Sequence, residues 1–249
     1  MKDILTIALR LRLAVISWVV FLIGLIIMSF GIALMIRANL GSAPWDVLNI
    51  GLFNHFGLTV GTWSILIGIL IVGSTSLLTK MWPKSGAVAN MILVGIFIDF
   101  FLNLVGTPPT LFGRGLMLII GILVNGIGTS VYISAHIGAG PRDSLMLYLV
   151  EKTGMKLALV RRIIEVIVLV IGWCLGGPVN VGTLVYGLSI GSIVGKSLPY
   201  CEKWVEKWKE RSGSHEDLNK GKIRTHNHDG AQPALREGPA SLKSDREGA

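Results

Sequence analysis

The dominant pattern along the chain is a series of long apolar stretches separated by short polar segments. Six such stretches occupy residues 13–36, 59–79, 85–106, 115–135, 157–177 and 179–198. A helix needs about 20 apolar residues to cross a bilayer, and backbone groups that face lipid must be hydrogen-bonded within their own segment. The pattern therefore predicts an all-α fold, a polytopic membrane helical bundle with six transmembrane helices.

The composition agrees with a membrane protein and excludes an ordinary water-soluble enzyme. Hydrophobic residues make up 51% of the chain and charged residues only 15%, with a mean hydropathy of +0.64. The formal net charge of +8 does not indicate a nucleic-acid partner, because the positive excess lies between the apolar stretches. Basic residues in those places set the orientation of a membrane protein instead.

Basic residues are distributed unevenly between the two sides of the predicted bundle. If the N-terminus is cytoplasmic, eleven Lys or Arg residues of the membrane region fall on the cytoplasmic side and only Arg37 and Arg114 on the other. Such an excess is typical of cytoplasmic loops. We therefore expect a multi-pass protein of the cell membrane with both termini in the cytoplasm, where residues 1–12 form the N-terminal segment.

The C-terminal region after Pro199 has a different character. In residues 199–211, Trp204 and Trp208 stand four apart among Glu and Lys, which is typical of an amphipathic helix in the lipid headgroup region. Residues 212–249 are polar and Gly-rich, with too few apolar residues to form a core. We expect a disordered cytoplasmic tail there.

The chain also contains an internal repeat at a spacing of 97 residues. The segment Leu40-Gly-Ser-Ala-Pro-Trp-Asp-Val-Leu48 returns as Ile137-Gly-Ala-Gly-Pro-Arg-Asp-Ser-Leu145, so that a G-x-x-P-x-D motif occurs twice. A weaker repeat at 96 residues relates Gly86 and Gly95 to Gly182 and Gly191. The sequence therefore predicts two homologous membrane units, residues 13–106 and 115–198.

The number of spans in each unit determines how the two units are oriented. Three spans per unit is an odd number, so the second unit must be inverted relative to the first, as in many transporters. The short apolar segments 44–56 and 141–150 are too short to cross the bilayer, and they either dip back into the protein or lie on its surface. If each crossed fully, the units would be parallel, and most of the charge asymmetry would be lost.

Each motif contains residue types suited to the start of a helix. Gly41 and Gly138 allow unusual backbone turns, Pro44 and Pro141 suit a first helical turn, and Asp46 and Asp143 follow two positions later. One interpretation is a capped helix start, because a carboxylate there meets free amides and the positive end of the helix dipole. The other is that both carboxylates face the interface between the units and bind a proton, a metal ion or a cationic group.

Other polar residues of the apolar stretches are also candidates. Asp99 lies deep in the third stretch, where carboxylates are commonly functional, and His136 adjoins the second motif and can exchange a proton near neutral pH. Glu165 is better explained by a local ion pair with Arg161 or Arg162 on the same helix face. Three asparagines either line a polar path or bond between helices: Asn90, Asn103 and Asn125.

The sequence contains no signature of catalysis or of a bound cofactor. Gly187-Leu-Ser-Ile-Gly191 fits the G-x-S-x-G pattern of hydrolases, but it lies inside an apolar stretch. With Gly195 it forms a row of glycines four apart, which favours close helix packing. We therefore predict no enzyme activity, no catalytic residues, no metal and no cofactor.

The two G-x-x-P-x-D motifs, with Gly182-Thr183 before the last stretch, resemble those of the YczE/YitT-like family of bacterial integral membrane proteins. The resemblance covers about residues 16–200 and implies a prokaryotic plasma-membrane protein, without assigning site residues. We expect a small secondary transporter or permease for an unidentified small solute or proton, with lipid as its surroundings and a homodimer left open. The alternative is an accessory protein that anchors a cytoplasmic partner.

Overall fold

The computed structural model describes residues 2–80, 82, 83, 85–138 and 140–225, and the side chains of 2–6, 8–10, 141, 143, 144, 147 and 212–225 lie outside this description. Within it the secondary structure is helical, as the sequence predicts, and it contains eight helices. They are α1 (Lys2–Ala38), α2 (Pro44–Phe56), α3 (Val60–Thr79), α4 (Ser85–Leu104), α5 (Leu111–Ser134), α6 (Pro141–Thr153), α7 (Leu157–Cys174) and α8 (Val181–Thr225).

Five helices of the described chain are long and apolar enough to cross a membrane, one fewer than predicted. They are α1, α3, α4, α5 and α8, within the ranges Leu11–Ala38, Val60–Thr79, Ser85–Leu104, Leu111–Ser134 and Val181–Arg211. The helix that does not qualify is α7, which has 18 residues and includes Arg161, Arg162 and Glu165. At 1.5 Å per residue it extends for about 27 Å, slightly less than a bilayer core.

The centre of the bundle is an antiparallel pair formed by α1 and α5. Glycines let the two backbones approach closely, because a Cβ atom at any of these glycines would overlap the other helix. The contacts are Gly24 with Tyr132, Gly31 with Asn125, Gly128 with Met28 and Gly121 with Met35. Residue numbers rise along α1 as they fall along α5, so the helices run in opposite directions.

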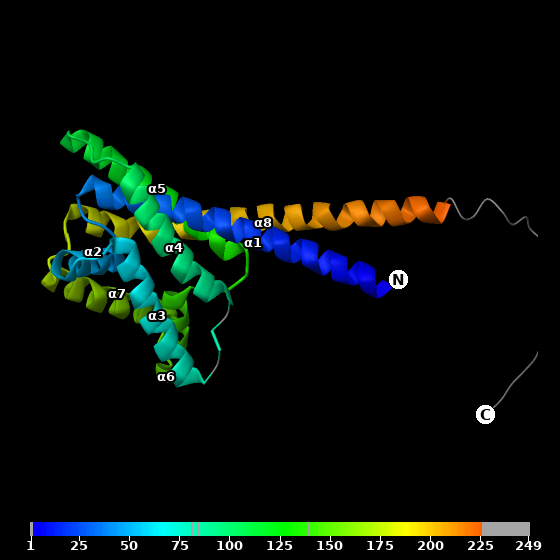
Figure 1. Ribbon diagram of the computed structural model, residues 1–249, viewed down its shortest axis with the longest axis horizontal. Coiled ribbons are helices and arrows are strands. Elements are labelled where there is room, and N and C mark those ends of the chain that lie inside the picture. The colour runs from blue at the N-terminus through cyan, green and yellow to red at the C-terminus, as the bar shows by residue number, and fades with distance from the viewer. Residues whose placement is uncertain (1, 81, 84, 139, 226–249) are drawn as a thin grey trace, which may run out of the picture.

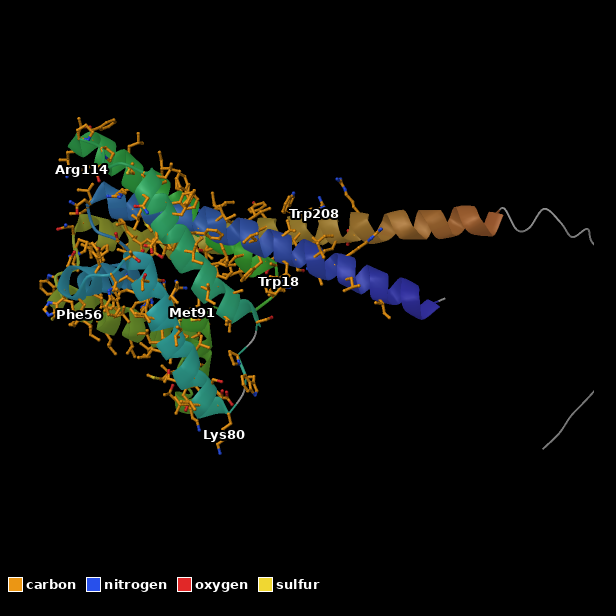
Figure 2. The ribbon with its side chains drawn as sticks, in the orientation of Figure 1. Trp18, Phe56, Lys80, Met91, Arg114 and Trp208 are labelled. Carbon is orange, nitrogen blue, oxygen red and sulfur yellow. The ribbon has the colours of Figure 1, made fainter. Side chains whose placement is uncertain are left out.

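The other helices surround this pair in a regular way. α4 packs along α1 and α8 along α5, while α2 packs against α7 and α6 against α3. The N-terminal part of α1 and the C-terminal part of α8 project from the same end of the bundle (Figure 1). Phe56 and Arg114 lie at the opposite end (Figure 2).

The two short helices begin as the motifs predict, with Pro44 and Pro141 in their first turns. Asn39, directly after α1, and His136, two residues after the end of α5, adopt a left-handed backbone with φ of 52° and 57°, and Gly41 has φ of 102°. Asn and His tolerate this region better than most residues. Residues with a left-handed backbone therefore precede each short helix: Asn39 and Gly41 before α2, and His136 before α6.

Each turn packs against the start of a helix from the other unit. The Gly182 backbone N–H, at the start of α8, donates to the Leu40 carbonyl at 2.7 Å. At the start of α4, a Cβ on Gly86 would lie 2.9 Å from the Ile137 side chain. The turns thus join the two units to each other.

The C-terminal helix differs from its prediction in two respects. α8 continues through Pro199 to Thr225 as a single helix, so residues 199–211 form no separate helix and the backbone of 212–225 is helical; residues 226–249 lie outside the described chain. Val205, beyond the proline, is buried in the same apolar cluster as Phe21 of α1, so this part of α8 still packs on the bundle.

The predicted close packing on the glycine row of α8 is also absent. In the described chain nothing lies within 4 Å of a Cβ position at Gly187, Gly191 or Gly195. Their counterparts in the first unit behave differently, because Gly95 of α4 contacts Gly61 of α3. The exposed row therefore marks a face of α8 that α7 does not cover.

Candidate functional site

A cavity of about 180 Å³ lies in the centre of the bundle, and each of the eight helices contributes to its wall. Met91 lines it from α4 and lies in the middle of the bundle, whereas Lys80 and Arg114 lie at the periphery (Figure 2). The lining is half polar in character, with Asp46, Asn49, Ser64, Asn90, Asn125, Thr129, Arg142, Arg161 and Tyr186 among its residues. This volume suits a solute of a few heavy atoms or several water molecules.

The two units line this cavity with equivalent positions. At spacings of 97 or 96 residues, the pairs are Met28 and Asn125, Ile32 and Thr129, Ala43 and Gly140, Ser64 and Arg161, Asn90 and Tyr186, and Val94 and Ile190. The side chains within a pair differ in chemistry, since the counterpart of Ser64 is Arg161 and the counterpart of Asn90 is Tyr186. The two units therefore contribute equivalent positions to the cavity wall but different charges.

Asp46 is the carboxylate that the structure brings to the cavity. Its residue is only 1% exposed, and its Oδ2 atom has no hydrogen-bond partner among the described residues. No side chain caps α2, so the capping interpretation of this residue has no hydrogen bond to support it. Burial raises the pKa of Asp46 to about 6, and the positive charge of Arg142 opposes that rise.

Two arginines from the second unit face the same space. The Arg142 guanidinium lies 4.8 Å from the centroid of the Trp45 ring, a cation–π contact between counterpart positions of the two motifs. Arg161 Nε donates to Glu165 Oε1 at 2.9 Å, which confirms the predicted ion pair. From the sequence, the two arginines were expected only to set the membrane orientation or to form a local ion pair. The alignment of Arg142 with Trp45 in the repeat could have indicated that Arg142 lies at the cavity.

Asn49, one turn after Asp46 on α2, is a further cavity residue that the sequence did not single out. It is 1% exposed, and its Nδ2 atom has no hydrogen-bond partner in the described part of the chain. A buried amide without a partner is costly, so such a donor normally meets a ligand or water. The position i+3 from the motif aspartate places both side chains on one face of α2.

The remaining predicted site residues lie elsewhere or outside the described side chains. Asp99 accepts from Thr59 Oγ1 at 2.5 Å and from the Gly61 N–H at 2.8 Å, which ties α4 to the start of α3. His136 is exposed and forms the left-handed turn before α6. The backbone of Asp143 lies in the first turn of α6, but its side chain is not described.

Two of the predicted asparagines take part in the central structure. Asn90 and Asn125 line the cavity, and Asn125 Nδ2 also donates to the Met28 carbonyl of α1 at 3.4 Å. Asn125 and Met28 are themselves separated by 97 residues. Asn125 therefore bonds between helices, as one of the two interpretations predicts, and it also lines the cavity.

These observations define a class of protein, a helical integral membrane protein with a polar cavity inside its bundle. Residues 15–198 match a family of unknown function, DUF6198, and the chain belongs to that family. The match covers both motifs and ends before the C-terminal part of α8.

Individual relatives agree with this assignment. The chain is 47% identical to the "Uncharacterized membrane protein YczE" of Bacillus subtilis (strain 168) over 186 residues, which are 74% of this chain and 86% of that protein. It is 34% identical to an "Uncharacterized protein" of Haemophilus influenzae over 70% of this chain and 80% of the relative. It is 29% identical to "Uncharacterized protein YyaS" of Bacillus subtilis, over 73% of this chain and 92% of the relative. The predicted resemblance to YczE-like membrane proteins is confirmed, and no solved structure matches the chain.

Proposed function

We propose that this protein is a small secondary transporter of the cell membrane, built from two inverted three-span repeats around the central cavity. The repeats are residues 13–106 and 115–198, with α7 as a short sixth span. The solute enters the cavity between the repeats from one side and leaves from the other. Transport by inverted repeats around a central site is a recurrent architecture.

The observation that carries this proposal is contact between residues that occupy the same position in the two repeats. Trp45 touches Arg142, and Met28 touches Asn125, each pair being 97 residues apart. Two copies related by a two-fold axis bring identical positions together only at that axis. The cavity contains residues of both pairs, which supports a site on the axis between the halves.

The glycine contacts between α1 and α5 show the same two-fold symmetry. Replacing each residue by its counterpart turns the Gly31–Asn125 contact into Gly128–Met28, and Gly24–Tyr132 into Gly121–Met35. Because the two helices are antiparallel, the axis that relates them is perpendicular to them. If both helices cross the membrane, this axis lies in the bilayer plane, which supports inversion.

The helix pair α3 and α4 and its counterpart pair α7 and α8 differ in a way that suits alternating access. In the first repeat α3 packs on α4 through Gly61 and Gly95 and through the Asp99 hydrogen bonds. In the second repeat the counterparts are Ala158 on α7 and Gly191 on α8, and nothing described lies close to Gly191. An exchange of these two arrangements would close one side of the cavity and open the other.

The arrangement of the termini is consistent with both lying in the cytoplasm. The first part of α1 and the last part of α8 leave the bundle at one end, and Arg114 lies at the other (Figures 1 and 2). The excess of basic residues, eleven against two, assigns the first of these ends to the cytoplasm.

Flux measurements with purified protein in liposomes test this proposal. The probes are pyruvate as an anion, methylammonium as a cation, and urea as a neutral solute. Saturable uptake of at least one probe above protein-free liposomes is expected, with Arg162→Gln as a variant outside the cavity wall that retains it. Uptake of none of the probes would contradict transport, and labelling that places both motifs on one side of the membrane would contradict the inverted arrangement.

A further inference from the structure

The charges around the central cavity indicate what kind of solute it holds. Four ionisable groups form this cluster: Asp46 from α2, Arg142 from α6, and Arg161 with Glu165 from α7. Among the described side chains they sum to zero when Asp46 is ionised and to +1 when it carries a proton. A monovalent anion would restore neutrality in the protonated form.

The backbone adds further preference for an anion. The N-cap residues of the 13-residue helices α2 and α6, Ala43 and Gly140, line the cavity, and neither provides a side-chain cap. The N-terminus of a helix bears a partial positive charge, which favours a nearby anion. Both helices direct this end toward the same space.

Two buried groups on α2 lack partners and face the cavity. Asn49 Nδ2 is a donor that needs an acceptor, and Asp46 Oδ2 has no donor. An anion satisfies the first and a proton satisfies the second. A cation would satisfy only Asp46 and would be repelled by the arginines and by both helix ends.

We propose that the cavity binds one small monovalent anion, of the size of a short monocarboxylate, together with one proton held by Asp46. This inference rests on the proposed transport function and would make that function a proton–anion symport. When Asp46 is ionised, its carboxylate competes with the anion for Arg142. Protonation by solvent converts the carboxylate to a neutral acid, removes its negative charge from the neighbourhood of Arg142 and leaves an O–H group that donates to the anion.

The other groups near Asp46 do not remove this coupling. Tyr186 from α8 lines the cavity as a neutral hydroxyl at ordinary pH. Glu165 is engaged with Arg161 at 2.9 Å, and α3, which also packs on α2, contains no acidic, basic or tyrosine residue. Asp46 and Arg142 are therefore the pair through which proton and anion influence each other.

Binding to the full-length protein in lipid nanodiscs tests this inference independently of transport. Isothermal titration calorimetry with pyruvate is performed at pH 5.5 and 7.5, with methylammonium gluconate as the cation probe. If only the protonated form binds and the pKa of Asp46 is about 6, the affinity for pyruvate falls about 25-fold between these pH values. Close to one proton is taken up per anion bound at pH 7.5.

Three variants distinguish a role in coupling from a loss of folding. Asp46→Asn, which mimics the protonated acid, is expected to bind pyruvate equally at both pH values and without proton uptake. Arg142→Gln is expected to lose at least tenfold in affinity at both, with partial recovery in Arg142→Lys. Arg162→Gln, beside Arg161 but outside the cavity wall, is the matched control and should match the native protein.

The outcomes separate this inference from the transport proposal. Binding of pyruvate with proton uptake but without flux supports the site and contradicts transport. Flux of methylammonium without pyruvate binding supports transport and overturns the anion assignment. Binding of pyruvate by the native protein with equal affinity at both pH values and no proton uptake overturns the coupling through Asp46.

Discussion

Replacement of Asp99 by alanine tests whether this carboxylate fastens α3 to α4. The change removes two hydrogen bonds, one from Thr59 Oγ1 at 2.5 Å and one from the Gly61 N–H at 2.8 Å, and leaves the Gly61 N–H without this acceptor. Hydrogen bonds to a charged group contribute about 1.5 to 3 kcal/mol each in favourable cases, and cap residues about 1 kcal/mol. Partial exposure of Asp99 places the expected loss at roughly 2 kcal/mol.

The assay is thermal unfolding of the purified protein, followed by tryptophan fluorescence. For a chain of this size, 2 kcal/mol lowers the midpoint by about 4 to 8 °C. Glu165→Ala is the control, because the Arg161–Glu165 pair is exposed, at 48% and 32% of the two side chains, and such pairs contribute only about 0.3 to 0.5 kcal/mol. The loss in Asp99→Ala should also be non-additive with Thr59→Ala.

The result that contradicts this reasoning is specific. If Asp99→Ala unfolds at the native temperature but no longer binds the anion of the central cavity, Asp99 acts in binding. Its hydrogen bonds to α3 would then be incidental.

Two more predictions concern the packing of the repeats. Gly31→Ala should lower the unfolding midpoint, because its Cβ would overlap the Asn125 backbone, whereas Gly73→Ala, with open space around it, should raise it through better helix propensity, and equal effects would contradict the close approach of α1 and α5. Cysteines replacing Ala158 and Gly191 should cross-link in membranes if α7 docks on α8 in a second state, and cross-linking no faster than with a cysteine at Leu188 would exclude that state.

The sequence predicted the elements of the fold more completely than the site. Period and length of the apolar stretches indicate helices, and Pro44 and Pro141 fix the starts of α2 and α6 because proline suits a first turn. One predicted span, α7, does not qualify as a membrane-crossing helix, because three of its 18 residues are charged. A helix after Pro199 was predicted, but its continuity with the last span was not, because the burial of Val205 in the cluster that contains Phe21 of α1 is not visible in the local sequence.

The site required contacts that no local pattern contains. Asp46 was a candidate because its motif repeats, and it does line the cavity. Asp99 has an equally suggestive position, but its partners Thr59 and Gly61 lie about forty residues away in sequence. Arg142 stands where the first motif has Trp45, and only the folded arrangement shows that the two stack on each other.

The most direct test of the inverted arrangement compares two counterpart positions at the ends of the short helices. His55 and Lys152 are both exposed and are separated by 97 residues. Each is replaced by cysteine in a chain whose Cys174 and Cys201 are serine, and each is labelled with a membrane-impermeant maleimide in intact cells and in inside-out vesicles. Inverted repeats predict labelling of the His55 position only from outside and of the Lys152 position only from the cytoplasmic side; labelling of both from one side would contradict the account.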